Sequence, residues 1–428
     1  MSKNNQLFSI SCIILLSCVY TYMMFWENRY INSGVLFFLI AVLSLLTLFI
    51  SSEVYLEKQE AVFFILTIYN IVQLSFMKII TNDAIKWTET LIIYTIILIA
   101  FINSFQKNGV SSNAIKIPLT VLSGIFVFGI YLQKLSPIFV SRINSMFLNP
   151  VSIINNRVFL TWGYYCGFTG LTVVSGLTCM VFGILQLDRA MSKNLKKANR
   201  ILCFACVLMA IYGTILIQKR GLFISTLVCI AVYILLKTEN RKSLLTSIVL
   251  IGFIGVVCYY FLYSNESGAL FLWRSFEKED LTSGRAVMWS DLIEKSKDVL
   301  ITGYGPASVT TLYGGDAHNI YLQVLYENGI IGLSLYLIFF GLNLVASYKC
   351  IKSGNNMARI GFAVQIGILV YGFTGNPLTD IFVFLLYLLA STIGYLQTSS
   401  TICQGNKKPI EYKYVKNGLG DKRWKKSA

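Results

Sequence analysis

Long apolar runs constrain this chain more than any other feature of its sequence. Typical examples are LFSISCIILLSCVYTYMMFW (7–26), GVLFFLIAVLSLLTLFI (34–50) and LLTSIVLIGFIGVVCYYFLY (244–263). Each is about as long as a helix needs to cross a bilayer core of roughly 30 Å. Because lipid offers no hydrogen-bond partners to an exposed backbone, helices are the expected spanning elements. Only 13% of the 428 residues are charged, against about 25% in ordinary soluble domains. The sequence therefore predicts an all-α, polytopic integral membrane protein.

The apolar runs add up to about twelve predicted transmembrane helices. The sixth is long enough to be tilted or to begin above the membrane. The predicted spans are residues 7–26, 33–51, 61–80, 88–105, 117–133, 158–187, 201–218, 221–236, 244–263, 329–348, 360–374 and 381–398. They divide the chain into helices one to nine (1–263), one large loop containing helices (264–318), helices ten to twelve (319–398) and a basic tail (399–428).

Clusters of Lys and Arg predict the orientation of the chain in the membrane. The loops 188–200 (DRAMSKNLKKANR), 237–243 (KTENRKS) and 349–359 (KCIKSGNNMAR) are basic, as is the tail. Cytoplasmic loops carry such an excess, and an even number of predicted spans separates each cluster from the next. We therefore expect these loops and both termini to be cytoplasmic and the 264–318 loop to be external. The net charge of +16 then reflects topology and contact with anionic headgroups, and we expect no nucleic acid partner.

Several polar residues should meet on the external face. They are Arg157, Lys219, Arg220, Arg285, Asp380 and the only histidine of the chain, His318. Arg220 lies in a turn so short (QKRG, 218–221) that it belongs at the membrane surface. Arginines, a histidine and a carboxylate at one membrane interface suit an anionic, membrane-anchored ligand.

Each of these residues also has a plain structural alternative. Arginines at helix ends often extend to the lipid headgroups, Arg285 could pair with Asp280, and His318 could be an ordinary hydrogen-bonded loop residue. Ser283 is a candidate N-cap of a helix beginning near Arg285, whose positive dipole end would favour anions. Trp289 in that helix is expected to be an interfacial anchor or a core residue.

Metal and nucleotide chemistry are not predicted. A lone histidine with no cysteine in the 264–318 loop argues against a zinc or iron site. Most of the ten cysteines are scattered through apolar runs, as small buried hydrophobes are. GYGPAS (303–308) lacks the Gly-Lys-Ser/Thr of a phosphate-binding Walker loop. We expect no metal and no cofactor.

What remains is acid–base and electrostatic work by one imidazole beside arginines. The planar fork of arginine binds phosphate oxygens at two points and can neutralise a departing pyrophosphate. A histidine can take a proton from an attacking hydroxyl near neutral pH, and nearby arginines would lower its pKa and keep it neutral. Together these groups describe transfer from a lipid-linked pyrophosphate to a hydroxyl.

The same residues resemble a known family. TSGRAVMW (282–289), ITGYGP (301–306) and HNIYLQVLYENGIIGLSLYL (318–337) resemble the C-terminal signature of the O-antigen polymerase and O-antigen ligase superfamily. QKRG resembles that family's arginine at an external helix end, and NNRVFLTWGYYCGFTG (155–170) its Arg-then-glycine segment. The resemblance covers roughly residues 155–395. The segment after Arg157 lacks the Asn-Pro often found there, which puts sugar contacts in that region in doubt.

The resemblance implies a metal-independent glycosyltransferase with twelve helices in the bacterial cytoplasmic (inner) membrane. Its donor would be a glycan on undecaprenyl pyrophosphate, used at the external or periplasmic face. By motif, Arg220 and Arg285 would bind the pyrophosphate, and His318 would activate or position the acceptor hydroxyl. Arg157 would help to hold the donor. Lys219, which precedes Arg220 directly, is a further candidate for substrate binding.

Two further residues are candidates for substrate binding. Asn319 would orient the His318 ring or contact a sugar, and Asp380, at the start of the last span, is the remaining member of the predicted site.

The leading interpretation is a polymerase of lipid-linked repeat units for O-antigen or capsule, with membrane lipid and a chain-length regulator as candidate partners. An O-antigen ligase, which transfers finished glycan to lipid A-core, would use the same chemistry. A flippase of lipid-linked oligosaccharides is the alternative from another class. Transporters commonly have internal repeats and ionisable residues in mid-span. This sequence shows no clear internal repeat and almost no charges in mid-span, which argues against a flippase.

Overall fold

The fold of the described residues is all-α apart from two short strands. The computed structural model describes residues 3–51, 53–107, 109–192, 194–238, 241–274 and 284–397, together with the strands. The first helices are α1 (Lys3–Phe25), α2 (Ser33–Ile50), α3 (Lys58–Phe76), α4 (Asn82–Gln106), α5 (Asn113–Leu135), α6 (Pro137–Phe147), α7 (Pro150–Thr161), α8 (Thr172–Ala190) and α9 (Lys197–Leu216). They are followed by α10 (Arg220–Leu236), α11 (Arg241–Tyr263), α12 (Glu266–Leu272), α13 (Arg285–Ser296), the 3-10 turn η2 (Lys297–Val299), α14 (Ser308–Tyr313), α15 (Ile320–Lys352), α16 (Asn356–Tyr371), α17 (Ile381–Thr392) and η3 (Ile393–Gln397). Strand β1 (Tyr412–Lys413) pairs antiparallel with β2 (Lys425–Lys426).

The helices confirm a polytopic membrane protein. Among the described residues, eight helices are long and apolar enough to cross a membrane: α1 to α5, α8, α9 and α15. The pair α11 and α12 meets the same test together but bends by 99° at its break, so the count is nine if this pair is one span. Three shorter apolar helices, α10, α16 and residues 381–396, accompany them.

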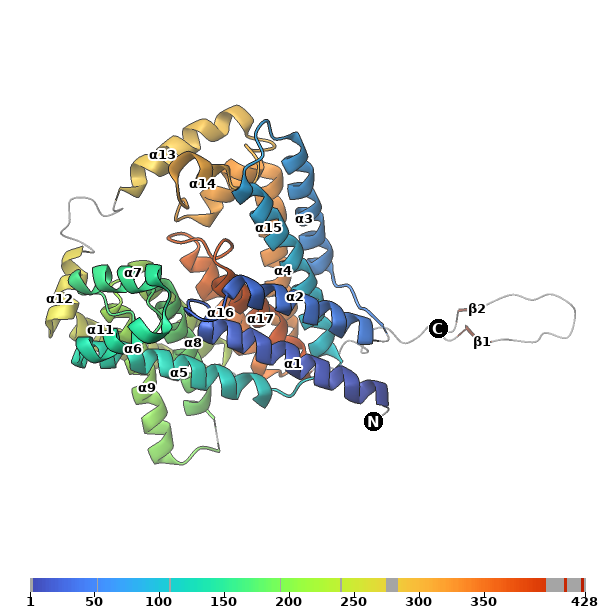
Figure 1. Ribbon diagram of the computed structural model, residues 1–428. Coiled ribbons are helices and arrows are strands. Elements are labelled where there is room, and N and C mark those ends of the chain that lie inside the picture. The colour runs from blue at the N-terminus through green and yellow to red at the C-terminus, as the bar shows by residue number, and fades with distance from the viewer. Residues whose placement is uncertain are drawn as a thin grey trace, which may run out of the picture.

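The last helix, α17, lies at the centre of the bundle (Figure 1). Every side chain from Phe382 to Thr392 is buried. The Phe384 ring stacks on Tyr387 and lies 4.4 Å from the Tyr94 ring of α4, measured between centroids. A helix that is apolar on all sides is expected at such a central position.

The predicted sixth span, residues 158–187, is wrong at its start. Helix α7 ends at Thr161, and α8 begins only at Thr172. The intervening segment turns at Gly163, Gly167 and Gly170, which all have positive φ angles. Such angles favour glycine and cannot continue a right-handed helix. At Gly167 a Cβ atom would also lie 2.7 Å from the backbone nitrogen of Ile130 in α5.

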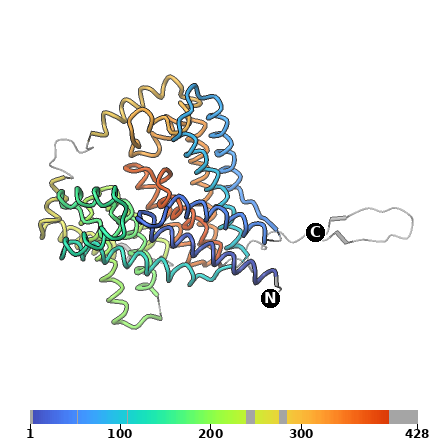
Figure 2. The backbone as a smooth tube through the Cα atoms, in the orientation of Figure 1, coloured from blue at the N-terminus to red at the C-terminus, as the bar shows by residue number. Residues whose placement is uncertain are grey.

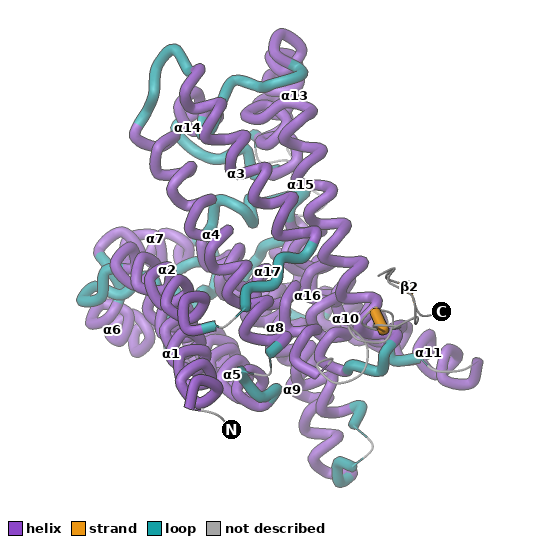
Figure 3. The backbone as a smooth tube through the Cα atoms, turned by 90° about the vertical axis from the view of Figure 1, so that its right-hand side faces the viewer, coloured by secondary structure: helices purple, strands orange, loops and turns teal. Residues whose placement is uncertain are grey.

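Part of the long polar segment folds onto α15. The helices α13 and α14 lie over the same end of α3 and α15 in two perpendicular views (Figures 1 and 3). Figure 2 shows the backbone of these helices in the orientation of Figure 1. Helix α15 is kinked at Gly329, whose φ of 64° and ψ of −167° are non-helical. A Cβ atom at Gly329 would lie 2.3 Å from the carbonyl oxygen of Ile301, so glycine allows the close approach. The Ile330 amide then donates to the Leu300 carbonyl at 2.9 Å.

Helix α3 also contacts the place where the 300–302 segment packs against the kink of α15. The Tyr69 hydroxyl donates to the carbonyl oxygens of Thr302 and Asn328, at 3.0 Å each. The buried Asn328 amide donates to Asn70 at 2.9 Å and to Gln73 at 2.6 Å. Buried polar groups that are all paired in this way hold their elements in one arrangement. The segment carrying the predicted site is therefore attached rigidly to two long helices.

Candidate functional site

The QKRG turn between α9 and α10 carries two of the predicted basic residues. Its first residue, Gln218, has a left-handed φ of 61°, and its side-chain amide donates to the Ser267 carbonyl of α12 at 2.8 Å. Arg220 is the first residue of α10 and follows Lys219 directly. A Cβ atom at Gly221 would lie only 1.8 Å from the Thr374 hydroxyl oxygen. The glycine of the motif therefore lets α10 begin directly against the turn that precedes α17.

Arg285 lies at the first position of α13. The preceding residue, Gly284, has a φ of 85° and occupies the N-cap position. The Arg285 Nη1 atom donates to the Thr374 carbonyl oxygen at 3.3 Å. The predicted N-cap Ser283 and the predicted partner Asp280 lie outside the described residues. Thr374 thus contacts Arg285 and packs against the start of α10.

His318 is held in an unusual backbone conformation. Its φ is 54°, a left-handed value that costs energy in a residue other than glycine. The carbonyl oxygen of the neighbouring Ala317 accepts from Trp289 Nε1 at 2.8 Å, and the Ala317 amide donates to Gln323 at 3.1 Å. On the other side, the Asn319 side chain accepts from the Tyr321 amide and caps α15. The two neighbours therefore fix the position of the His318 backbone.

These three segments line one cavity of about 740 Å³. It brings together four of the predicted residues, Lys219, Arg220, Arg285 and His318, from positions about a hundred residues apart. Its remaining wall is largely aromatic and apolar. These residues include Trp162, Tyr164, Val173, Leu222, Ile224, Trp273, Trp289 and Tyr371. A cationic pocket with aromatic walls fits a ligand that has an anionic group and flat or apolar parts.

The cations of the cavity act on one another. Burial lowers the pKa of the His318 imidazole, and the charges of Arg285 and Lys219 lower it further, against an opposing effect of Asp316. Burial and the charge of Arg285 also lower the pKa of the Lys219 ammonium. Burial lowers the pKa of Arg285, and the nearby charge of Arg220 contributes to the shift. The cavity therefore carries positive charge that an anion would neutralise.

The comparison with protein families adds an independent finding. Residues 204–337 match the family model described as O-antigen ligase. The chain carries an O-antigen ligase family domain. This confirms the resemblance over a shorter range than the sequence motifs suggested, and no curated protein matches the chain. The domain places the chain among the membrane glycosyltransferases of the O-antigen ligase and polymerase type, which transfer lipid-linked glycans.

The O-antigen ligase domain contains the core of the cavity. Arg220, Arg285 and His318 all lie within residues 204–337, as do the kink of α15 and the loop packed on it. Arg157 and Asp380 lie outside the matched range.

Three predicted residues do not line this cavity. Arg157 is exposed on α7. Asn319 is the cap of α15, next to His318. Asp380 caps α17, where its carboxylate accepts from the Val383 amide at 3.3 Å.

Asp380 lines a second cavity, of about 400 Å³, together with Asp316 and Glu27. Burial raises the pKa of the Asp380 carboxyl to about 6. The Thr379 hydroxyl donates to Asp316 at 3.2 Å, which ties this cavity to the residue two positions before His318.

The structure adds two residues that sequence reasoning missed or placed elsewhere. Arg274 lines the cationic cavity, donates to the Trp162 carbonyl at 2.6 Å and lies 4.6 Å from the centroid of the Tyr164 ring. The adjacent Trp273 and Arg274 in the sequence LWRSF could have indicated this role, because both side chains line the cavity. Trp289, expected to be an anchor or core residue, instead lines the cavity and holds Ala317.

Proposed function

We propose that the protein is a polysaccharide polymerase that joins oligosaccharide repeat units carried on undecaprenyl pyrophosphate, for O-antigen or capsule. The observation that carries this proposal is the single cavity lined by Lys219, Arg220, Arg285 and His318. Its charge suits a pyrophosphate, and its only imidazole suits a hydroxyl acceptor. The family domain supports lipid-linked glycan transfer as the reaction class.

In the proposed reaction, an acceptor sugar hydroxyl attacks the anomeric carbon of the donor glycan. The new glycosidic C–O bond forms as the C–O bond to pyrophosphate breaks, and the lipid pyrophosphate leaves. The acceptor proton passes to His318, whose lowered pKa keeps the imidazole neutral and able to accept it. The reaction balances without a redox partner or an added nucleotide.

Arg220 and Arg285 stabilise the charge that develops on the leaving pyrophosphate. Each of the two guanidinium groups can bind two phosphate oxygens. Because the cavity is partly shielded from water, the attraction between guanidinium and phosphate is stronger there than in solution. Lys219 adds charge without the fixed fork geometry. This electrostatic role explains how the site could work without a metal ion.

The other predicted residues take supporting roles in this proposal. Asp380, in the second cavity, binds hydroxyl groups of a glycan, and Asn319 positions His318 through the cap of α15. Arg157, exposed on α7, contacts a part of the donor outside the cationic cavity.

The proposed orientation places the cavity on the external or periplasmic face of the cytoplasmic membrane, with both termini cytoplasmic. The cavity is lined near the start of α8 and α10 and the end of α16. The basic loops follow the opposite ends of α8 and α10 and precede the start of α16. In this proposal the bent pair forms one span and the three shorter apolar helices also cross the membrane, which makes twelve spans in all; eight or nine helices meet the length and composition test by themselves.

Reconstitution in liposomes with an undecaprenyl-pyrophosphate-linked repeat unit tests the proposed function. A ladder of product lengths, persisting in a metal chelator, is the expected result. Transfer only to added lipid A-core would instead identify a ligase, and movement of the substrate across the bilayer without a new glycosidic bond would identify a flippase. Adding a chain-length regulator should change the ladder's distribution but should not be needed for its formation.

A further inference from the structure

Another basic cavity lies at the opposite ends of α8, α10 and α16 from the cavity that contains His318. It has a volume of about 720 Å³ and is lined near the ends of α8 and α10 and the starts of α5 and α16. Arg220 and Lys237 stand at the two ends of α10, about 25 Å apart at the usual helical rise of 1.5 Å per residue. This cavity is therefore separate from the candidate catalytic site and takes no part in the proposed reaction.

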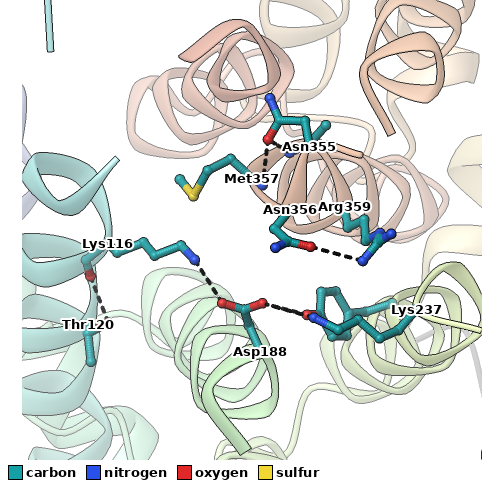
Figure 4. A network of polar contacts seen from close by, with 10 residues as sticks. Lys116, Thr120, Asp188, Lys237, Asn355, Asn356, Met357 and Arg359 are labelled. Atoms are coloured by element: carbon teal, nitrogen blue, oxygen red, sulfur yellow. Dashed lines mark hydrogen bonds and ion pairs between the residues drawn. The ribbon is translucent and has the colours of Figure 1, made fainter. Parts of the chain in front are cut away.

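One carboxylate organises the basic side chains of this cavity. Figure 4 shows Lys116 and Lys237 reaching Asp188 from opposite sides. The Lys116 Nζ atom lies 2.8 Å from the carboxylate, and the Lys237 Nζ atom lies 3.8 Å from it. The Tyr233 hydroxyl donates to the same carboxylate at 2.7 Å. Asp188 thus holds the two lysines at the cavity wall.

The cavity nevertheless carries a surplus of positive charge. Among the described lining residues, four are cationic and only Asp188 is acidic; Arg189 and Arg359 are the other cations. The Arg359 Nη1 atom donates to the Asn356 side chain at 2.9 Å, which holds this guanidinium group at the cavity (Figure 4). The surplus positive charge favours an anionic ligand.

Two helix N-termini add to the positive electrostatic potential in this cavity. Asn113 and Asn356 are the first residues of α5 and α16, and both line the cavity. The Ala114 amide of α5 donates to Ser111 and the Met357 amide of α16 donates to Asn355. The two helix starts therefore contribute the positive partial charge of their dipoles, which favours phosphate groups. Four side-chain cations and two helix starts at one cavity therefore describe a site for a phosphate-bearing anion.

The apolar part of the lining decides between a lipid and a soluble phosphate. Ile117 and Val121 lie along α5 next to Lys116, and they are 60% and 56% exposed. Leu185 and Met191 continue the apolar lining. Exposed apolar side chains on a membrane-crossing helix face acyl chains, so the cationic cavity wall and an acyl-chain surface lie side by side here. A phospholipid fits both surfaces at once, whereas a soluble phosphate ester fits only the cationic one. Basic pockets between membrane helices are suited to anionic lipid headgroups.

We propose that this cavity binds one anionic phospholipid, with the headgroup phosphate among Lys116, Arg189, Lys237 and Arg359. The acyl chain lies along Ile117 and Val121. The lipid then joins four helices, α5, α8, α10 and α16, at the end opposite the cationic cavity.

The test uses mass spectrometry of the intact, detergent-solubilised protein titrated with lipids. Phosphatidylglycerol should bind with defined stoichiometry, and zwitterionic phosphatidylcholine should bind more weakly. The double variant Arg189→Gln, Arg359→Gln should weaken phosphatidylglycerol binding about tenfold or more, since it removes two headgroup charges. The matched control, Lys196→Gln with Lys197→Gln, removes two charges from the neighbouring loop outside the cavity and should leave binding unchanged.

Three results would overturn the proposal. They are equal binding of the two lipids, unchanged phosphatidylglycerol binding by the double variant, and displacement of the lipid by an equal concentration of sn-glycerol 3-phosphate. The last result would assign the site to a soluble phosphate ester. If the double variant does not fold, thermal unfolding of the unmodified protein gives the answer, because phosphatidylglycerol should raise its Tm more than phosphatidylcholine does. An equal Tm in both lipids would contradict the proposal.

Discussion

Arg285 donates a hydrogen bond from Nη1 to the carbonyl oxygen of Thr374. This contact joins the start of α13 to the turn between α16 and α17. The same turn packs directly against Gly221, the residue after Arg220. The spacing of the two arginines thus depends on a backbone segment about ninety residues further along the chain than Arg285.

Replacing Gly221 by alanine should separate the two arginines. The added Cβ atom would collide with Thr374, so either α10 or the turn must move. We expect glycosyl transfer to fall about 100-fold, because displacements near 1 Å can have this effect on catalysis. Product formation per minute in proteoliposomes measures it, and the double variant Gly221→Ala, Thr374→Gly should recover part of the loss. Full activity of Gly221→Ala would show that this close packing does not set the site.

Arg285→Lys tests whether the guanidinium fork is needed beyond its charge. Lysine keeps the positive charge but cannot bind two pyrophosphate oxygens in one plane. We expect kcat to fall by about 100-fold, in the range seen when one group that stabilises transition-state charge is removed. Lys297→Gln, an exposed change beside α13, serves as the charge-removal control and should keep normal activity. Equal rates for Arg285→Lys and the unmodified enzyme would remove the fork from the mechanism.

The acid side of the pH profile should report on His318. Burial and the charges of Arg285 and Lys219 lower its pKa below the ordinary value of about 6.5. Because the base must be neutral, activity should stay high as the pH falls through 6.5. It should decline only when the pH reaches the lowered pKa of His318. Arg285→Gln removes a repelling charge, so the imidazole becomes easier to protonate and the decline should move to higher pH. Measured kcat/KM against pH gives both curves, and an unchanged profile in Arg285→Gln would contradict the assignment.

Trp289→Phe should affect His318 without touching its chemistry. The change removes the Nε1 donor to the Ala317 carbonyl, which anchors the residue before His318. We expect a loss of about 1 kcal/mol in stability, the usual net worth of such a hydrogen bond, and a lower kcat with little change in the KM for the donor. Thermal unfolding and steady-state kinetics separate the two effects. An unchanged kcat would leave Trp289 as a wall residue only.

That Arg220, Arg285 and His318 would lie at one cavity could be predicted from the sequence because the signals are local. Arg220 lies in a turn too short to leave the membrane surface, and Arg285 lies near the start of a predicted helix, for which Ser283 was the candidate N-cap. His318 immediately precedes a long apolar span. Length and hydropathy were also sufficient for the helical, multi-pass architecture, since those properties are set by the bilayer.

What the sequence could not predict depends on tertiary packing. The left-handed φ of His318 is imposed by anchors on both of its neighbours, and nothing in HNIY signals it. Arg274 enters the cavity because α12 is held by Gln218, a contact between distant segments. The break between α7 and α8 arises from glycines whose φ angles are known only once the chain folds back on α5.

The most direct measurement is the product ladder made by purified protein in liposomes from an undecaprenyl-pyrophosphate-linked repeat unit. The account predicts a ladder from the unmodified protein and from Lys297→Gln. It predicts only unextended repeat units from Arg220→Ala and from His318→Ala, both at unchanged protein level and Tm. A full ladder from either alanine variant would contradict the proposal that this cavity carries out the transfer.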